Sequence, residues 1–127
     1  MNVKTGIDII EVERIKENIE KHGDRFLNKI FTQKEIEYCE SKNTQKYQSY
    51  SGRFAAKEAV FKALSYKLDN KYEIEWKDIE IVNDENGRPV VNVYGKPKEI
   101  IKNSDNIDIS ITHVKEMALA SVVAVFE

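Results

Sequence analysis

The pattern of apolar and polar positions predicts a strand at each end of the chain and several helices between them. Residues 3–12 are largely β-branched and apolar, which is typical of a strand. Thr32 and Glu35 have the spacing of a capping box, and they mark the start of a helix that continues to about Glu40. Apolar spacing predicts further helices over residues 13–22, 24–31 and 44–68.

The second half of the chain is expected to consist mainly of strands, separated by turn residues at 83–87 and 115–116. We expect strands over residues 76–82, 90–94, 107–112 and 118–126, and a short helix that Gly95 and Pro97 open and that continues over residues 98–103. Strands and helices mix without a regular β–α–β alternation, and no linker or repeat divides the sequence. The sequence therefore predicts one α+β domain spanning residues 1–127.

One position breaks the pattern of the longest predicted helix. Its large apolar residues fall at alternating spacings of three and four and share one stripe: Tyr47, Tyr50, Phe54, Phe61, Leu64 and Leu68. The stripe predicts an apolar residue at position 57, where the sequence has Lys57. Small apolar residues on the other faces indicate a largely buried helix, and a buried charge costs free energy unless it is paired or binds an ion.

Glu58 and Lys62 follow on the same helix, four positions apart, so that their side chains can meet on one face. One interpretation is an ion pair on the helix surface, which contributes only about 0.3–0.5 kcal/mol. The other interpretation is a carboxylate that binds a cation beside an ammonium that binds an anion. That combination suits a metal-bound phosphate.

Asp8 is a second carboxylate in an apolar setting. It stands among β-branched residues of the first predicted strand, on the face that it shares with Gly6 and Ile10. Either Asp8 lies in solvent on an edge strand or caps the following helix, or it binds the same cation as Glu58. Two carboxylates, completed by water and phosphate oxygens, commonly bind Mg²⁺, and Mn²⁺ also prefers oxygen ligands.

A third group of polar residues lies where the strand over 107–112 ends. Ser110, Thr112 and His113 concentrate hydrogen-bonding groups there, although a histidine that only satisfies its own hydrogen bonds is the alternative to a functional one. The sequence has no G-x-S-x-G, Walker or G-x-G-x-x-G motif. Any phosphate would therefore be bound by side chains and a metal.

Composition and charge narrow the classes of function. The 127 residues include 20 Lys and Arg against 22 Asp and Glu, and a net charge of −2 argues against a nucleic-acid binder. Residues 1–67 hold 13 basic and 10 acidic residues, whereas residues 68–127 hold 7 and 12, which allows a basic face for an acidic partner. No membrane helix or secretory signal is expected, and with a single cysteine, Cys39, we expect a cytoplasmic protein.

Three separated blocks of the sequence resemble the bacterial holo-[acyl-carrier-protein] synthases, the small group of 4′-phosphopantetheinyl transferases. The blocks are GIDIIEVERI at 6–15, RFAAKEAVFKAL at 53–64 and SITH at 110–113, with Gly87-Arg-Pro89 at the family's spacing. The resemblance spans essentially the whole chain. Two positions depart from the family, since Thr112 replaces the usual serine and Val114 replaces a frequent small polar residue.

The resemblance implies transfer of the 4′-phosphopantetheine arm of coenzyme A to a serine of apo-acyl carrier protein. The reaction would depend on Mg²⁺, release adenosine 3′,5′-bisphosphate and support fatty acid biosynthesis. The resemblance also implies a compact fold in which a small antiparallel sheet packs on one long helix and shorter helices. The resemblance further implies a homotrimer with each active site between two protomers, and no binding of nucleic acid or membrane.

The same resemblance implies roles for individual residues. Asp8 and Glu58 would bind the metal, Lys62 would assist the departing phosphate, and Arg14 would face the acidic carrier protein. The residues assigned to the coenzyme A site are Arg53, Gly87, Pro89, Ser110, Thr112 and His113. The sequence does not single out a general base, because a metal-bound water or hydroxide, Asp8 and Glu58 are all candidates.

A different class of function also fits the charge distribution. A non-catalytic module could bind an acidic protein through the basic N-terminal half of the chain. Coenzyme A separates the two hypotheses, because with Mg²⁺ it would raise the thermal stability of the transferase and leave that of a binding module unchanged.

Overall fold

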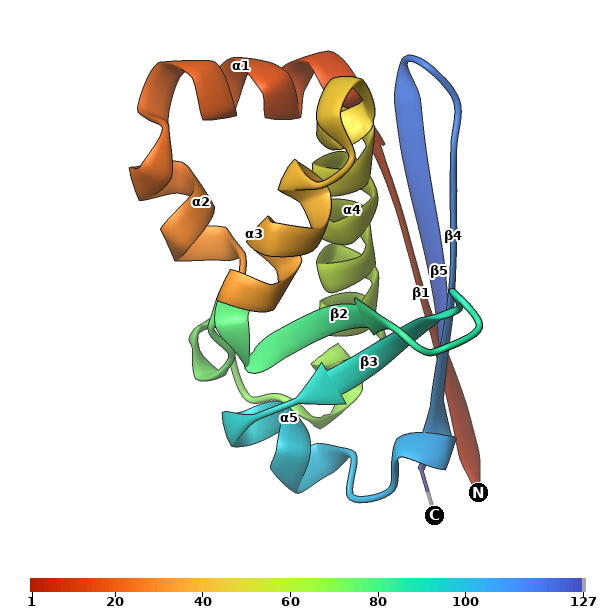
Figure 1. The fold of residues 1–127 in the computed structure, drawn as a ribbon. Coiled ribbons are helices and arrows are strands. Elements are labelled where there is room, and N and C mark those ends of the chain that lie inside the picture. The colour runs from red at the N-terminus through yellow and green to blue at the C-terminus, as the bar shows by residue number, and fades with distance from the viewer. Residues whose placement is uncertain (127) are drawn as a thin grey trace.

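Helix α4 (Lys46–Leu64) stands in the middle of the fold, between a sheet and a group of shorter helices (Figure 1). The computed structural model describes residues 1–126. Turns of 3₁₀ helix at Asn43–Gln45 and Ser65–Lys67 extend α4 at its two ends. The predicted helix over residues 44–68 is therefore confirmed, with tighter turns at both ends. No helix among the described residues has the length and apolar character needed to cross a membrane.

A three-stranded antiparallel sheet covers one side of α4 (Figure 1). Its strands, in spatial order, are β1 (Asn2–Glu11), β5 (Met117–Phe126) and β4 (Ile107–His113). Asn2 pairs with Phe126, so the two ends of the described chain lie side by side at one end of the sheet. Along β1, every second residue from Lys4 onward faces α4, as the predicted alternation requires.

Three short helices lie on the other side of α4 (Figure 1). They are α1 (Val12–His22), α2 (Asp24–Ile30) and α3 (Gln33–Glu40). The predicted capping box is confirmed, because the Thr32 amide donates to Glu35 Oε1 at 2.8 Å and the Glu35 amide donates to Thr32 Oγ1 at 3.4 Å. This box fixes the start of α3 and the direction of the Glu35 side chain.

A two-stranded hairpin and a short helix lie across one end of α4 (Figure 1). They are β2 (Ile79–Asn83), β3 (Pro89–Val93) and α5 (Gly95–Ile100). The predicted strand over 76–82 is wrong at its start, because Trp76–Asp78 form a 3₁₀ turn in which Asp78 accepts a hydrogen bond from the Glu75 amide. The last α-helix begins at Gly95, as predicted, but it ends at Ile100 and not at residue 103.

Two hydrophobic clusters lie on opposite sides of α4. The larger joins α4 to the sheet and the hairpin through small helix residues such as Ala59 and Ala63. The smaller joins α4 to α1, α2 and α3 around Phe31 and Tyr50. The α+β class is confirmed, and α4 is buried on both sides, as its apolar faces predict.

Candidate active site

Strand β1 lies unusually close to α4, because Gly6 has no side chain at the crossing point. A Cβ atom added at Gly6 would lie 1.8 Å from the carbonyl oxygen of Ala59 and 3.0 Å from the amide nitrogen of Ala63. Only a glycine fits this contact without moving the strand. Asp8 comes two residues later on the same face of β1, and the close contact therefore brings its carboxylate to the helix that carries Glu58 and Lys62.

Asp8, Glu58 and Lys62 meet between β1 and α4. Lys62 Nζ lies 3.3 Å from Asp8 Oδ1 and donates to the carbonyl oxygen of Ile7 at 2.9 Å. The ion pair of Lys62 thus crosses from helix to strand, and the interpretation of a simple Glu58–Lys62 pair along the helix surface is wrong for this structure. Asp8 does lie on an edge strand, but its side chain is only 17% exposed.

The electrostatics of Glu58 favour a bound cation. Partial burial raises the pKa of the Glu58 carboxyl, the negative charge of Asp8 raises it further, and the positive charge of Lys62 opposes both effects. Two carboxylates that disfavour each other's ionised form are stabilised by a divalent cation between them. Among residues 1–126 no group of three or more His, Cys, Asp or Glu side chains could bind a metal. The chemistry of two carboxylates fits an ion such as Mg²⁺, which retains water and substrate oxygens as ligands.

Two hollows adjoin this group, and Glu58 lines both of them. A groove of about 270 Å³ is lined by Asp8, Arg14, Asn18, Phe26, Phe54 and Glu58, together with Ile9, Ile10 and Ile15. A larger cavity of about 590 Å³ has aromatic walls at Phe61, Tyr72 and Trp76, with Lys29 and Lys71 among its other lining residues. A ligand whose phosphate group lies next to Glu58 could therefore extend into either hollow.

Arg53 lies away from the two carboxylates, between α3 and the end of β2. Its guanidinium carbon stacks 4.0 Å from the centre of the Tyr38 ring, and Nη2 donates to Asn83 Oδ1 at 3.3 Å. The side chain is almost fully buried, and its Nε has no hydrogen-bond partner among the described residues.

Gly87 and Pro89 belong to the turn between β2 and β3. Gly87 has a φ of 82°, a left-handed conformation that favours glycine, and its amide donates to the Asp84 carbonyl at 2.9 Å. Pro89 begins β3 and lines a separate hollow with Arg88 and Asp108. The glycine at position 87 therefore has a local structural reason, in addition to the role in coenzyme A binding that we predicted.

Ser110, Thr112 and His113 all lie on β4 and are exposed. Ser110 and Thr112 belong to the outer face of the sheet, opposite α4. His113 lines a shallow hollow with Gln45 and Gln48 at the start of α4.

The predicted site residues therefore form two groups within one chain. Asp8, Glu58 and Lys62 meet between β1 and α4, with Arg14 in the adjoining groove. The residues predicted for coenzyme A lie near the hairpin and on β4. Neither the groove nor the larger cavity at Glu58 is lined by a residue of the second group.

Two residues at this site were not singled out from the sequence. Trp76 lines the larger cavity and stacks on Phe54, with ring centres 5.0 Å apart and planes inclined by 29°. Glu35 was recognised only as a helix cap, yet it forms a fully buried ion pair with Lys57 at 2.8 Å. The unexplained charge at Lys57 was a signal that such a partner exists, but 22 residues separate the two and no local pattern links them.

Solved structures with this fold define the class of protein. The holo-(acyl-carrier-protein) synthase from Bacillus anthracis, in complex with CoA (3′,5′-ADP), superimposes with a TM-score of 0.76 at 35% identity, covering 95% of this chain and 94% of that one. The holo-[acyl-carrier-protein] synthase of Helicobacter pylori, in complex with coenzyme A, gives a TM-score of 0.80 at 29% identity, covering 95% and 99%.

Sequence comparison gives the family. The model of the 4′-phosphopantetheinyl transferase superfamily matches residues 4–120, and the chain belongs to this superfamily. Its relatives include the holo-[acyl-carrier-protein] synthase of Caldicellulosiruptor saccharolyticus, which is 50% identical over 121 residues, 94% of this chain and 93% of the relative. The enzyme of the same name from Ruminiclostridium cellulolyticum is 45% identical over 125 residues, covering 97% and 92%.

Proposed function

We propose that this chain is a holo-[acyl-carrier-protein] synthase, which transfers the 4′-phosphopantetheine arm of coenzyme A to a serine of apo-acyl carrier protein. Adenosine 3′,5′-bisphosphate is the second product. The observation that carries the proposal is the meeting of Asp8, Glu58 and Lys62 between two elements that are far apart in the sequence. Two carboxylates and an ammonium provide what cleavage of the coenzyme A pyrophosphate requires, namely positioning and stabilisation of charge.

In the proposed reaction the serine oxygen of the carrier attacks the phosphorus that bears the pantetheine arm, and the bond from that phosphorus to the oxygen of the nucleotide phosphate breaks. The serine proton passes to one of the candidate bases, which are Asp8, Glu58 and a water or hydroxide at the metal site. Asp8 and Glu58 hold Mg²⁺, or Mn²⁺ in its place. When bound, the ion neutralises pyrophosphate charge and polarises the phosphorus. Lys62, held by Asp8 and the Ile7 carbonyl, presents its positive charge to the phosphate that leaves with the nucleotide.

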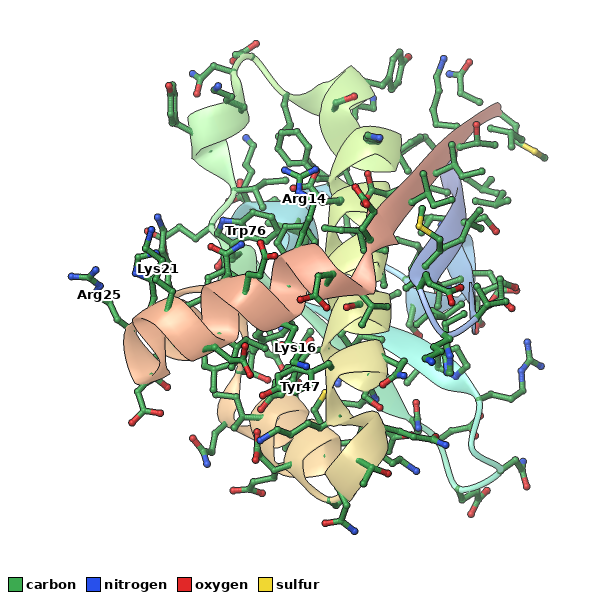
Figure 2. All side chains as sticks on the ribbon, turned by 90° about the horizontal axis from the view of Figure 1, so that it is seen from above. Arg14, Lys16, Lys21, Arg25, Tyr47 and Trp76 are labelled. Atoms are coloured by element: carbon green, nitrogen blue, oxygen red, sulfur yellow. The ribbon has the colours of Figure 1, made fainter. Side chains whose placement is uncertain are left out.

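The nucleophile comes from the acidic carrier protein, and α1 offers a basic surface beside the groove. Arg14, Lys21 and Arg25 are exposed and lie along one side of α1 and the start of α2, whereas Lys16 lies on the opposite side with Tyr47 (Figure 2). Arg14 also lines the groove that contains Asp8 and Glu58. A carrier bound along Arg14, Lys21 and Arg25 would therefore direct its serine towards the two carboxylates.

We propose that the active enzyme is a homotrimer in which a second protomer completes each site. The outer face of the sheet is one support, because it leaves four large apolar residues 45–59% exposed in the single chain: Val3, Ile7, Ile9 and Val123. The second support for a homotrimer is that the predicted site residues form two separate groups within one chain. A neighbouring protomer could bring Arg53, Gly87, Pro89, Ser110, Thr112 and His113 to the carboxylates of the first.

We also propose a cytoplasmic location. Cys39, the one cysteine of the chain, is free and fully buried, as is common in proteins of reducing compartments.

Mass spectrometry tests the proposed reaction. Purified protein, incubated with Mg²⁺, coenzyme A and an apo-acyl carrier protein, is expected to increase the mass of the carrier by one phosphopantetheine group. A carrier in which the acceptor serine is replaced by alanine should show no increase. No mass change with several apo-carriers would reject the function.

A further inference from the structure

The ion pair between Glu35 and Lys57 is unusual because both side chains are completely buried. Glu35 Oε1 lies 2.8 Å from Lys57 Nζ, and neither side chain has any exposed surface. Burial lowers the pKa of the Lys57 ammonium, and the adjacent Glu35 carboxylate opposes that shift. Removing two charges from water is costly, and an apolar pair of similar volume often stabilises a fold as well or better. The pair is therefore expected to serve a purpose besides stability.

Apart from the bond that Glu35 accepts from the Thr32 amide at the start of α3, the other hydrogen bonds of the pair hold one segment of main chain. Lys57 Nζ donates to the carbonyl oxygens of Ile79 at 2.6 Å and Trp76 at 3.1 Å. Glu35 Oε2 accepts from the amide of Ile81 at 2.7 Å. The pair thus attaches the turn at Trp76–Asp78 and the first residues of β2 to both α3 and α4.

The attached segment forms a wall of the larger cavity. Lys57, Trp76 and Ile79 line that cavity together with Glu58. The Trp76 ring stacks on Phe54, which lines the groove on the Asp8 side. The main chain held by Lys57 therefore carries the aromatic side chain that lies between the two hollows adjoining Glu58.

We propose that Lys57, oriented by Glu35, is a positioning residue for donor binding. By holding the carbonyls of Trp76 and Ile79 against α4, it fixes the cavity wall beside Glu58 in the shape that bound coenzyme A requires. The inference rests on the proposed function, since it assumes that the donor is bound at Glu58.

Two substitutions separate the main-chain attachment from the ion pair. Lys57→Met removes both hydrogen bonds to the carbonyls, and we expect the KM for coenzyme A to rise about tenfold, with a smaller change in kcat. Glu35→Gln leaves Lys57 able to donate to both carbonyls but removes the charge that orients it, and we expect a lower melting temperature with a smaller rise in KM than in Lys57→Met. The Mg²⁺ concentration for half-maximal activity should be unchanged in both variants, because Glu58 is retained.

The double variant Glu35→Gln/Lys57→Met provides the sharper comparison. It contains no unpaired buried charge, so its melting temperature should recover towards that of the wild type. Its KM for coenzyme A should remain as high as that of Lys57→Met, because the carbonyls are still unattached. A purely structural role predicts that stability and KM recover together.

Ile101→Ala serves as a matched control for lost stability. Ile101 is buried in the cluster between α4 and the sheet and lines none of the hollows described above. Its truncation should lower the melting temperature without changing the KM for coenzyme A. The inference is overturned if Ile101→Ala raises the KM as Lys57→Met does, or if the double variant regains the wild-type KM.

Calorimetry of coenzyme A binding with Mg²⁺, in the absence of carrier protein, distinguishes this inference from the proposed function. We expect the dissociation constants of the variants to follow the same order as their KM values. Binding that is equal in wild type and Lys57→Met would reject the positioning role even where transfer is normal. If coenzyme A binds more weakly to Lys57→Met than to the wild type, but the wild type transfers nothing to the carrier, only the proposed reaction is rejected.

Discussion

Gly6 and Ala59 are in contact through their backbones at the point where β1 crosses α4. A Cβ atom at position 6 would lie 1.8 Å from the Ala59 carbonyl oxygen, which is far inside van der Waals contact. Asp8 follows Gly6 by two residues, and Glu58 precedes Ala59 by one. The absence of a side chain at Gly6 therefore sets how closely the two carboxylates can approach.

Gly6→Ala should separate the carboxylates and lower stability. The added methyl group must push β1 away from α4, and overpacking of this kind typically costs about 1–3 kcal/mol. We expect a lower melting temperature and a smaller stabilisation by Mg²⁺ than in the wild type, both measured by thermal unfolding. Gly52→Ala is the control, because its Cβ would meet only the side chain of Ile111, at 3.0 Å. Normal stabilisation of Gly6→Ala by Mg²⁺ would contradict this account.

Lys62→Met should reduce catalysis much more than stability. The Lys62 side chain is 50% exposed, and an exposed ion pair such as that with Asp8 contributes at most about 1 kcal/mol. Loss of its charge at the departing phosphate should lower kcat by about 10²–10³-fold. Steady-state kinetics at saturating coenzyme A and carrier tests this expectation. Lys67→Met, which removes another exposed lysine just beyond α4, should retain normal kcat.

Glu58→Gln should abolish transfer and yet stabilise the metal-free protein at neutral pH. The pKa of Glu58 is raised in the folded state, by burial first and by Asp8 second. The folded protein thus binds this proton more tightly than the unfolded chain, and stability falls as the pH rises through the range in which Glu58 ionises. A glutamine side chain does not ionise, so the variant does not lose stability in this way as the pH rises.

Thermal unfolding in EDTA between pH 4 and pH 8 tests the direction of this pH dependence. The range begins just below the ordinary glutamate pKa of about 4.3 and extends well above it. The melting temperature of wild type relative to Glu58→Gln should decrease towards pH 8. Addition of Mg²⁺ should stabilise the wild type selectively. If the wild type instead gains stability relative to the variant as the pH rises without metal, the pKa of Glu58 is not raised in the folded protein.

Charge reversal on α1 should weaken carrier binding on one side of the helix only. Lys21→Glu, on the side of Arg14 and Arg25, should raise the KM for the carrier several-fold, with an effect that decreases at high salt. Lys16→Glu, on the side of Tyr47, is the matched control and should leave this KM unchanged (Figure 2). Equal effects of the two reversals would mean that the carrier does not bind the Arg14 side specifically. The KM for coenzyme A should be normal in both variants.

Val123→Glu should prevent assembly of the proposed homotrimer. Val123 lies on the outer face of β5 and is 45% exposed in the single chain, so an isolated protomer tolerates a charge there. Burial of three carboxylates in a trimer interface would be unfavourable. Sedimentation should therefore give a folded monomer without transfer activity. Tyr72→Glu, at a residue 81% exposed and remote from the sheet, should remain a trimer. A fully active monomer would remove the trimer from the proposal.

Local patterns predicted most of the elements correctly. The capping box at Thr32 and Glu35 marked the start of α3, and the alternation along β1 placed Asp8 on the face of Gly6 and Ile10. These features depend on residues within one turn or one strand. The start of β2 was missed because Trp76 and Ile79 are both apolar, whereas the turn depends on the side chain of Asp78 capping the Glu75 amide.

Contacts between distant segments could be predicted only in part. The cost of burying Lys57 indicated that a partner exists, but Glu35 joins it through the packing of α3 on α4. Lys62 was within reach of Glu58 on the helix, and its pairing with Asp8 depends on the close approach of β1 at Gly6. The roles of Arg53, Ser110, Thr112 and His113 in coenzyme A binding stay predictions, since these residues lie outside the hollows at Glu58.

The burial of Cys39 has a practical consequence for following the reaction. Burial raises the pKa of its thiol to about 12, so the folded chain presents no reactive thiolate at neutral pH. The group that the enzyme transfers ends in a free thiol. The assay requires a carrier that lacks cysteine and the removal of unreacted coenzyme A. A maleimide dye would then label only the modified carrier, and the native enzyme would remain unlabelled.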